Sequence, residues 1–207
     1  MLVLGDAHAD DPEKRRALLD AYESTDDDVA LQVGDLLYYD LPYDTYFIAG
    51  NNEEFDVIDI LRRGETVDNL CLVSQRQTVE VEGLRIAGLS GNYAPTKYAS
   101  KRDELEGDDR RHFTRGEVEA AKRLEDVDLF LAHEAPHGLL EKNGYDVGKT
   151  PIDEILRSVE PQLCLVGHHH KHAESVFGET RVVSLAPVWE SYYRLDPESL
   201  ILKDKRT

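Results

Sequence analysis

Short apolar runs alternate with amphipathic stretches along this chain. Leu2 to Leu4, Val29 to Val33 and Tyr46 to Ile48 read as strands, whereas Pro12 to Tyr22 and Glu53 to Leu61 have helical periodicity. The alternation continues at Asp128 to Leu131, Pro151 to Val159 and Leu163 to Val166. This order is typical of βαβ units, in which helices cover a buried sheet.

Two other stretches predict antiparallel pairing. Thr78 to Val81 and Leu84 to Ala87 flank Glu82-Gly83 like the strands of a tight hairpin. Glu179 to Leu185, followed by Glu190 to Arg194, reads as a second such stretch. The two patterns together predict an α/β fold, a sandwich of two mixed β-sheets with helices outside. Because 207 residues allow one well-packed core, we expect residues 1–207 to form a single domain.

Composition excludes several classes of protein. No apolar run approaches the roughly 20 residues that cross a bilayer, and the strand predicted at Met1 to Gly5 leaves no room for a cleavable signal. We therefore expect a cytoplasmic protein with no membrane partner. Cys71 and Cys164 lie within apolar runs, so we expect both to be buried and neither to form a disulfide.

The charge balance is strongly acidic, with 42 Asp and Glu against 24 Lys and Arg and a net charge of −18. Such density repels itself in dilute buffer but is tolerated at molar ionic strength, where the screening length falls to about 3 Å. We therefore hypothesise a salt-loving source; the alternative is an acidic but ordinary bacterial or archaeal domain. The same charge argues against broad non-specific nucleic-acid binding.

Five short motifs occur where an apolar run gives way to a polar loop. They are Gly5-Asp6-Ala7-His8, Gly34-Asp35, Gly50-Asn51-Asn52-Glu53, Ala132-His133-Glu134 and Gly167-His168-His169-His170. Each motif alone is a weak signal, because an Asp-x-His pair or a glycine at a strand end is common without function. In an open α/β sheet the carboxyl ends of the strands lie along one edge, so the five motifs are expected to meet there.

The side chains that would meet are two aspartates, one asparagine and four histidines. They are Asp6, His8, Asp35, Asn51, His133, His168 and His170. Oxygen and imidazole donors without thiolates suit Mn, Fe, Ni or Zn, with Mn favoured, and do not suit a structural zinc site. This set is too large for one catalytic cation with an open position, so we expect two divalent metal ions. Such a pair can direct a hydroxide at a phosphoryl group.

In this order the motifs resemble the successive signature motifs of the calcineurin-like metallophosphoesterases, and the match covers almost the whole chain. The resemblance implies a four-layer α/β/β/α sandwich with the metals at one edge. It assigns Asp6, His8 and His170 to the first metal, Asn51, His133 and His168 to the second, and Asp35 to a bridge between them. The implied activity is hydrolysis of a phosphate ester by a metal-bridging hydroxide.

The third motif departs from the family. Its asparagine is normally followed by a histidine that donates a proton or contacts the phosphate, and here that position is Asn52. An amide donates a hydrogen bond but gives up no proton at neutral pH. We therefore consider His137, His169 and His172 as proton donors, each with a solvated loop histidine as the alternative. The candidate catalytic residues are then Asp35, Asn52 and His169.

The second motif also departs, since it ends at Asp40 without the usual glycine. Tyr38 and Tyr39 within it either stack on a base or pack in the core.

The run from Arg85 through Gly138 is similar to the branch of this superfamily that contains intron-lariat debranching enzymes. That similarity implies a phosphodiester in a nucleotide or RNA as substrate, such as a 2′–5′ linkage. Those eukaryotic enzymes differ in carrying a cysteine at the place of Ala7, a histidine at the place of Asn52, and a large extra domain.

Residues 92–116 form a long, polar and charged segment, which is typical of a functional loop. Its arginines Arg102, Arg110, Arg111 and Arg115 are candidates to bind a backbone phosphate. The alternative is that Arg102 and Arg110 neutralise the nearby Asp103, Glu104, Asp108 and Asp109. The candidate substrate contacts are Tyr38, Arg111, Arg115 and His137.

Three functions remain open at this point. The first is a phosphodiesterase that acts on a nucleotide or a small nucleic-acid substrate. The second is a phosphomonoesterase or nucleotide pyrophosphatase that uses the same metals. The third is a metal-binding scaffold, which the absence of the proton-donating histidine favours and the complete ligand set disfavours.

Overall fold

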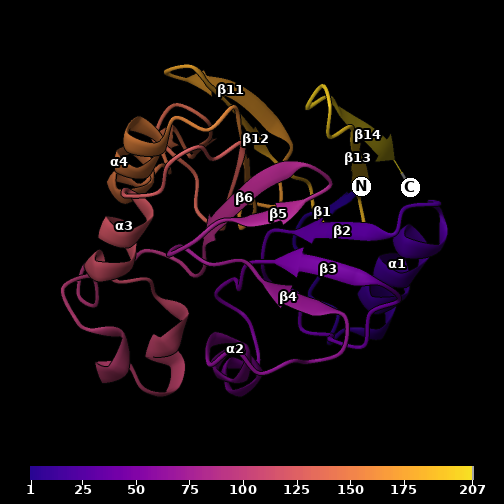
Figure 1. Ribbon diagram of the computed structural model, residues 1–207, viewed down its shortest axis with the longest axis horizontal. Coiled ribbons are helices and arrows are strands. Elements are labelled where there is room, and N and C mark those ends of the chain that lie inside the picture. The colour runs from indigo at the N-terminus through magenta and orange to yellow at the C-terminus, as the bar shows by residue number, and fades with distance from the viewer. Residues whose placement is uncertain (207) are drawn as a thin grey trace.

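Two six-stranded sheets form the centre of the computed structural model, which describes residues 1–206 (Figure 1). The first sheet has the order β14-β13-β1-β2-β3-β4 and the second β11-β12-β10-β7-β6-β5. The first contains β1 (Leu2–Leu4), β2 (Val29–Gln32), β3 (Asp44–Phe47), β4 (Leu70–Leu72), β13 (Ser191–Leu195) and β14 (Leu202–Arg206). The second contains β5 (Val79–Val81), β6 (Leu84–Leu89), β7 (Leu129–Ala132), β10 (Leu163–Val166), β11 (Ala173–Phe177) and β12 (Thr180–Ser184).

The helices complete a four-layer arrangement. They are α1 (Pro12–Glu23) and α2 (Phe55–Arg62) beside the first sheet, and α3 (Arg115–Ala121) and α4 (Thr150–Val159) beside the second. A short hairpin of β8 (Glu141–Lys142) and β9 (Tyr145–Asp146) and two 3₁₀ helices, η1 (Arg102–Glu104) and η2 (Gly107–Arg111), lie outside the layers. The predicted α/β/β/α sandwich is therefore confirmed.

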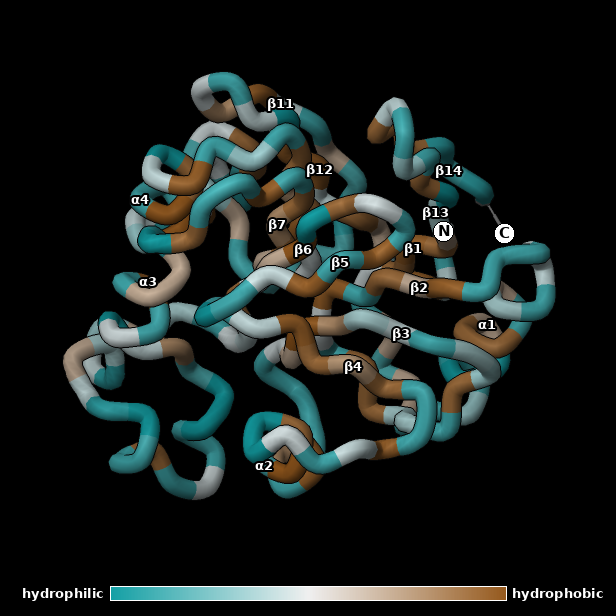
Figure 2. Tube along the Cα trace, viewed as in Figure 1, coloured by the Kyte–Doolittle hydropathy of each residue, from teal (hydrophilic) through white to brown (hydrophobic). Residues whose placement is uncertain are grey.

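Side-chain alternation along the strands produces the layers. Leu129 and Leu131 of β7 belong to the core shared by the two sheets, whereas Phe130 and Ala132 belong to a second core with α3 and α4. A third core lies between the first sheet and helices α1 and α2. Figure 2 shows that the strands carry much of the apolar sequence and the outer loops little of it. Adjacent residues of a strand point to opposite faces of its sheet. A strand that is apolar on both faces is therefore covered by the other sheet on one face and by helices on the other.

Both sheets are mixed. In the first sheet β1 to β4 are parallel, and β13 and β14 follow on the β1 side, each antiparallel to the strand before it in the sheet. In the second sheet β6, β7, β10 and β12 are parallel, with the antiparallel strands β5 and β11 at the two edges. The predicted hairpin around Glu82-Gly83 is confirmed as β5 and β6. Thr114, near the end of the charged segment 92–116, caps the first turn of α3.

The antiparallel pairing predicted between Glu179 to Leu185 and Glu190 to Arg194 is wrong. β12 pairs with β11 and β10 in one sheet, whereas β13 pairs with β1 and β14 in the other. The chain between β12 and β13 crosses from one sheet to the other. The backbone N–H of Leu185 donates to the carbonyl of Val166 after β10, and that of Val188 donates to the carbonyl of Asp6 after β1. This connection contains Pro187 and no glycine or asparagine, so it lacks the residues that make a tight hairpin turn.

The cysteines agree in part with expectation. Cys164 is buried, Cys71 is half-buried on β4, and both are free thiols. A search of the described helices finds none with the length and apolar character needed to span a bilayer.

Arg102 anchors the long segment 92–116. Its guanidinium donates to both carboxylate oxygens of Glu117 and to the carbonyl oxygens of Arg110 and His112. Arg110 instead reaches Asp56 and Asp59 on α2.

The alternative in which Arg102 and Arg110 neutralise Asp103, Glu104, Asp108 and Asp109 is therefore wrong, because their guanidinium groups reach other elements.

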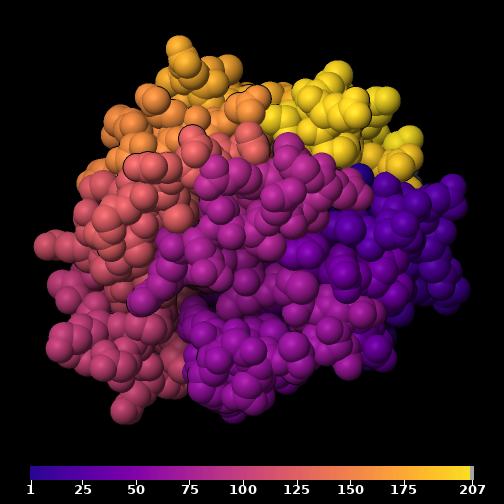
Figure 3. Space-filling view, in the orientation of Figure 1, coloured from indigo at the N-terminus to yellow at the C-terminus, as the bar shows by residue number. Residues whose placement is uncertain are grey.

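A cavity of about 580 Å³ lies beside this segment, and Figure 3 shows a hollow between α2 and the segment. The cavity is lined by Arg62, Arg76, Arg102 and Glu117 among others.

We expect Arg102→Met to lower the free energy of unfolding by about 3 kcal/mol, because it leaves the buried Glu117 carboxylate without its cation. Arg63→Met is the matched control, since Arg63 and Glu65 form an exposed pair worth less than about 1 kcal/mol. Denaturant titration measures both. Equal effects of the two substitutions would contradict the anchoring role.

Candidate metal centre

The five motifs meet at one edge of the sandwich. They follow the carboxyl ends of β1, β2, β3, β7 and β10, as the sequence predicted. One oxygen or nitrogen atom from each of Asp6, His8 and His170 lies within 4.8 Å of the others, and the same holds for Asp6, Asp35 and His133. Both groups are of a kind that can hold a metal ion.

The remaining predicted ligands adjoin these groups. Asn51 Oδ1 lies 3.1 Å from His133 Nε2, and the rings of His133 and His168 have centroids 5.0 Å apart. His8 Nε2 lies 3.5 Å from Asp35 Oδ2, and His133 Nε2 lies 3.5 Å from Asp35 Oδ1. The structure thus brings all seven predicted ligands to one place, with Asp35 between the two histidines.

The same residues join the two sheets. His133, at the end of β7, contacts the carbonyl oxygen of Val33 through Nδ1 at 2.8 Å. The backbone N–H of His168, after β10, donates to both oxygens of Asp6, after β1. At a third point, the N–H of Ala49 donates to Ser90 Oγ. Each bond runs from one sheet to the other, so any shift between the sheets would move the ligands relative to one another.

The proton on His133 is fixed by its backbone partner. A carbonyl oxygen only accepts, so Nδ1 carries a proton, and Nε2 faces Asn51 and Asp35. Burial disfavours the charged ring, but the carboxylates of Asp35 and Asp6 outweigh it and raise the pKa of His133, so a cation at Nε2 would take the place of a proton there. His8 Nε2 and His170 Nε2 also face each other at 3.2 Å. Acceptor atoms that converge in this way match the demands of a cation, so the residues fit a metal centre.

Burial sets the protonation of these groups. It lowers the pKa of His8 and His170, that of His168 to about 3 and that of His169 to about 4. These rings are therefore neutral at neutral pH, which is the form that binds metals. Burial also raises the pKa of Asp6 to about 6. The carboxylate of Asp35 is buried too, but His133 and two hydrogen bonds from Asn52 outweigh this and leave its pKa below the ordinary value.

Backbone conformations at the site are uncommon. His8, Asp35, His168 and His170 all have positive φ values, between 45° and 68°. Non-glycine residues in this region cost roughly 1–3 kcal/mol each and concentrate at functional sites. Gly50 meets a different need, because a Cβ there would overlap the backbone and carboxylate of Asp35. The glycine before Asn51 is thus required by the close approach of Asp35.

Asn52 holds Asp35 in place. Its backbone N–H donates to Asp35 Oδ1 at 2.7 Å and its amide Nδ2 donates to Oδ2 at 2.8 Å. The residue that replaces the family's histidine therefore contacts a predicted ligand directly.

Glu53 is a site residue that sequence analysis missed. Its buried carboxylate accepts hydrogen bonds from the N–H groups of Leu36, Leu37 and Gly50 and from the hydroxyl of Tyr39. Burial raises its pKa to about 7, although these donors oppose the rise. Glu53 thereby joins the loops of the second and third motifs, and α2 begins only at Phe55 rather than at Glu53 as predicted. Its place in the third motif was the available signal.

Trp189 also escaped prediction. Its ring centroid lies 5.4 Å from that of His170 and 5.9 Å from that of His8, with Lys14 Nζ 4.4 Å above it. Its ring thus packs beside these two predicted ligands.

The other predicted residues have structural partners. Tyr38 packs against the third core beneath Arg15, and Tyr39 bonds Glu53. His137 Nδ1 contacts Asp153 of α4 at 2.8 Å. His172 stacks on Tyr193.

The three remaining candidates are Arg111, Arg115 and His169, and the groups around them differ. Arg111 pairs with Asp108, and Arg115 lies over the ring of Tyr98. His169 lines a cavity with its buried Nε2 lacking a partner among residues 1–206.

We expect Glu53→Ala to lower the free energy of unfolding by about 3 kcal/mol, because three backbone N–H groups and one hydroxyl lose their acceptor. The exposed neighbour, in Glu54→Ala, should change it by no more than about 0.5 kcal/mol, since that side chain makes no capping bond. Urea titrations of both variants provide the comparison. If they unfold at the same concentration, Glu53 does not join the loops.

Comparisons with known proteins agree with this geometry. The family model described as calcineurin-like phosphoesterase matches residues 1–172. The chain is similar to the lariat debranching enzyme of Entamoeba histolytica, with 27% identity over 186 residues (76% of this chain, 52% of that enzyme). It is also similar to that of Schizosaccharomyces pombe, with 28% identity over 158 residues (62% and 33%). The chain thus spans about half or less of the length of these relatives.

Among solved structures, a protein of Thermus thermophilus has the same fold. It superimposes with a TM-score of 0.69 at 18% identity, covering 99% of this chain and 97% of that protein.

The family match covers most of the chain and includes all five motifs. The fold agrees with this match. The chain therefore belongs to the calcineurin-like phosphoesterases, a family of metal-dependent hydrolases of phosphate esters.

Proposed function

We propose that this chain is a phosphodiesterase with two divalent metal ions, acting on a nucleotide or a small nucleic-acid substrate. Asp6, His8 and His170 would hold the first ion, Asn51, His133 and His168 the second, and Asp35 would contact both. The observation that carries the proposal is the meeting of these neutral imidazoles and carboxylates at one edge. When bound, two such cations would lower the pKa of a water molecule and neutralise charge on a phosphate.

The chain's own residues support the chemistry in separate ways. Asn52 and Glu53 fix the Asp35 loop, the first through the carboxylate and the second through the backbone of the next two residues. Asn52 supplies a hydrogen bond but no proton, and His169 is neutral at neutral pH, so it also donates a hydrogen bond rather than a proton. We therefore expect a preference for leaving groups that depart without protonation.

The relatives suggest the class of substrate. The two enzymes named above are lariat debranching enzymes, which favours a phosphodiester in nucleic acid for this chain. Segment 92–116 is the proposed contact region, through Arg111 and Arg115. Arg102 and Arg110 bind carboxylates of other elements, whereas Arg111 pairs with the exposed Asp108 of its own turn and Arg115 lies over the ring of Tyr98.

The acidic composition leads to a further part of the proposal. A net charge of −18 suits a cytoplasmic protein of a salt-loving organism. Molar salt there would screen the repulsion between the carboxylates. We favour Mn as the metal. Assays therefore belong in molar KCl, with dilute buffer as the comparison.

We expect the protein to hydrolyse bis(p-nitrophenyl) phosphate faster than p-nitrophenyl phosphate when Mn is added in molar KCl. Asp35→Asn should lower that rate by about 100-fold or more, because it removes the charge shared by the two ions. Asp40→Asn, an exposed carboxylate of the same loop, is the matched control. A faster monoester rate would favour a phosphomonoesterase. Absence of hydrolysis with Mn, Fe, Co, Ni or Zn would favour the scaffold.

Asn52→His should restore the family's proton donor. We expect turnover to rise by about 100-fold for a diester with an alcohol leaving group but by less than about threefold for a nitrophenolate, which needs no proton. Asn52→Gln keeps an amide and serves as the control. An equal gain on both substrates would show that position 52 does not act on the leaving group.

A further inference from the structure

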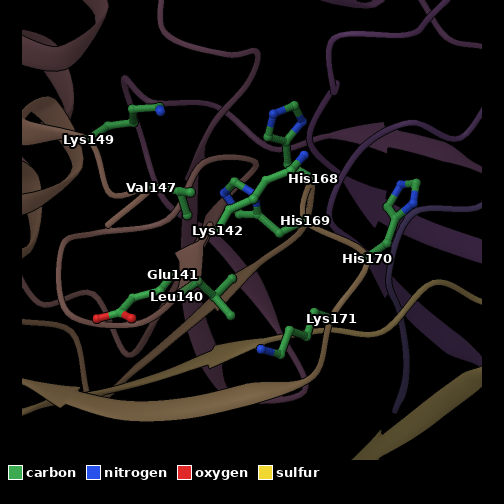
Figure 4. A pocket seen from close by; sticks show the side chains of 9 residues that line it. All are labelled: Leu140, Glu141, Lys142, Val147, Lys149, His168, His169, His170 and Lys171. Atoms are coloured by element: carbon green, nitrogen blue, oxygen red, sulfur yellow. The ribbon is translucent and has the colours of Figure 1, made fainter. Parts of the chain in front are cut away.

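A cavity of about 510 Å³ opens beside the last motif. His168, His169 and His170 form one side, and the β8–β9 hairpin and the chain after it form another (Figure 4). Three lysines line it: Lys142, Lys149 and Lys171. We call it the lysine cavity. Its volume is in the range of small-molecule sites.

Two of the three lysines of this cavity have no carboxylate partner in the described part of the chain, unlike several other lysines. Lys97, Lys101 and Lys122 each form an ion pair with a carboxylate. Lys142 and Lys171 form none with the side chains described, and the carboxylate oxygen nearest Lys149 is that of Glu134, at 4.0 Å.

Glu141 also lines the cavity, but Figure 4 shows its carboxylate turned away from the histidines. The cavity lining thus contains three lysines and one glutamate in a chain whose net charge is −18, so this surface favours an anion.

The cavity adjoins the predicted metal ligands. Its lining includes His168 and His170, two of those ligands, and His169 between them. Figure 4 shows Lys142 extending from the hairpin toward His168 and His169. A ligand there would touch the residues that lie beside the proposed metal ligands.

We propose that the lysine cavity binds a second phosphate of the substrate, next to the phosphate that is hydrolysed. The inference rests on the proposed phosphodiesterase function and narrows its substrate class. A phosphate carried by the neighbouring nucleotide fits lysines, which act as point charges toward phosphate oxygens. The preferred substrates are therefore phosphorylated oligonucleotides rather than isolated diesters.

The test compares the dinucleotide TpT with pTpT and TpTp, which carry an additional phosphate at one end. For the wild-type protein, kcat/KM for one of the phosphorylated forms should exceed that for TpT by about tenfold or more, mainly through KM. In Lys142→Gln/Lys171→Gln, this ratio should fall below about twofold. Both side chains are exposed, so the fold should persist.

The control is Lys203→Gln/Lys205→Gln on β14, an edge strand of the other sheet. It makes the same change in charge and should keep the wild-type ratio of kcat/KM values. A wild-type protein that does not distinguish the dinucleotides, or a double variant that keeps the ratio, overturns the lysine cavity as a phosphate site while leaving the phosphodiesterase intact.

If no diester is hydrolysed, the proposed function fails, and binding decides the inference separately. Calorimetry with thymidine 3′,5′-bisphosphate should show about fivefold or more weaker binding to Lys142→Gln/Lys171→Gln than to the wild-type protein. Equal binding would overturn the inference.

Discussion

The burial of two carboxylates where the two sheets meet is the constraint on which the rest of this structure depends. Asp6 and Asp35 are both shielded from water, and His133 lies between them, with ring nitrogens 3.8 Å from an Asp6 oxygen and 3.5 Å from an Asp35 oxygen. A single imidazole does not neutralise two carboxylates, and buried charge is costly unless it is paired. The arrangement therefore depends on the hydrogen bonds around it, and it suits a cation between the carboxylates.

The surrounding residues supply those hydrogen bonds. His168 donates through its backbone to Asp6, and Asn52 donates twice to Asp35. Four of the seven predicted ligands adopt left-handed backbone conformations, so local strain is accepted to aim their side chains. Packing of the three cores offsets that strain. The fold therefore stabilises a site that its local conformational preferences alone would not favour.

Much of this was predictable because it depends on short patterns. Alternating strands and helices give the layers. Polar residues after strand ends give the seven predicted ligands, which lie together because parallel strands present their carboxyl ends at one edge. The sheet change between β12 and β13 was not predictable, because either pairing satisfies the same apolar alternation. The acceptor role of Glu53 and the pairing of Arg102 with Glu117 depend on distances between loops, which no local pattern contains.

The position of β1 has a consequence for how the protein is made. This first strand lies between β2 and β13, and the loop after it is bonded to residues near 168 and 188. During synthesis these partners emerge long after β1, so one side of β1 stays unpaired until they have left the ribosome. Contacts of such long sequence separation form slowly, and the edge that carries the predicted ligands is complete only after β10 and β13 have joined it.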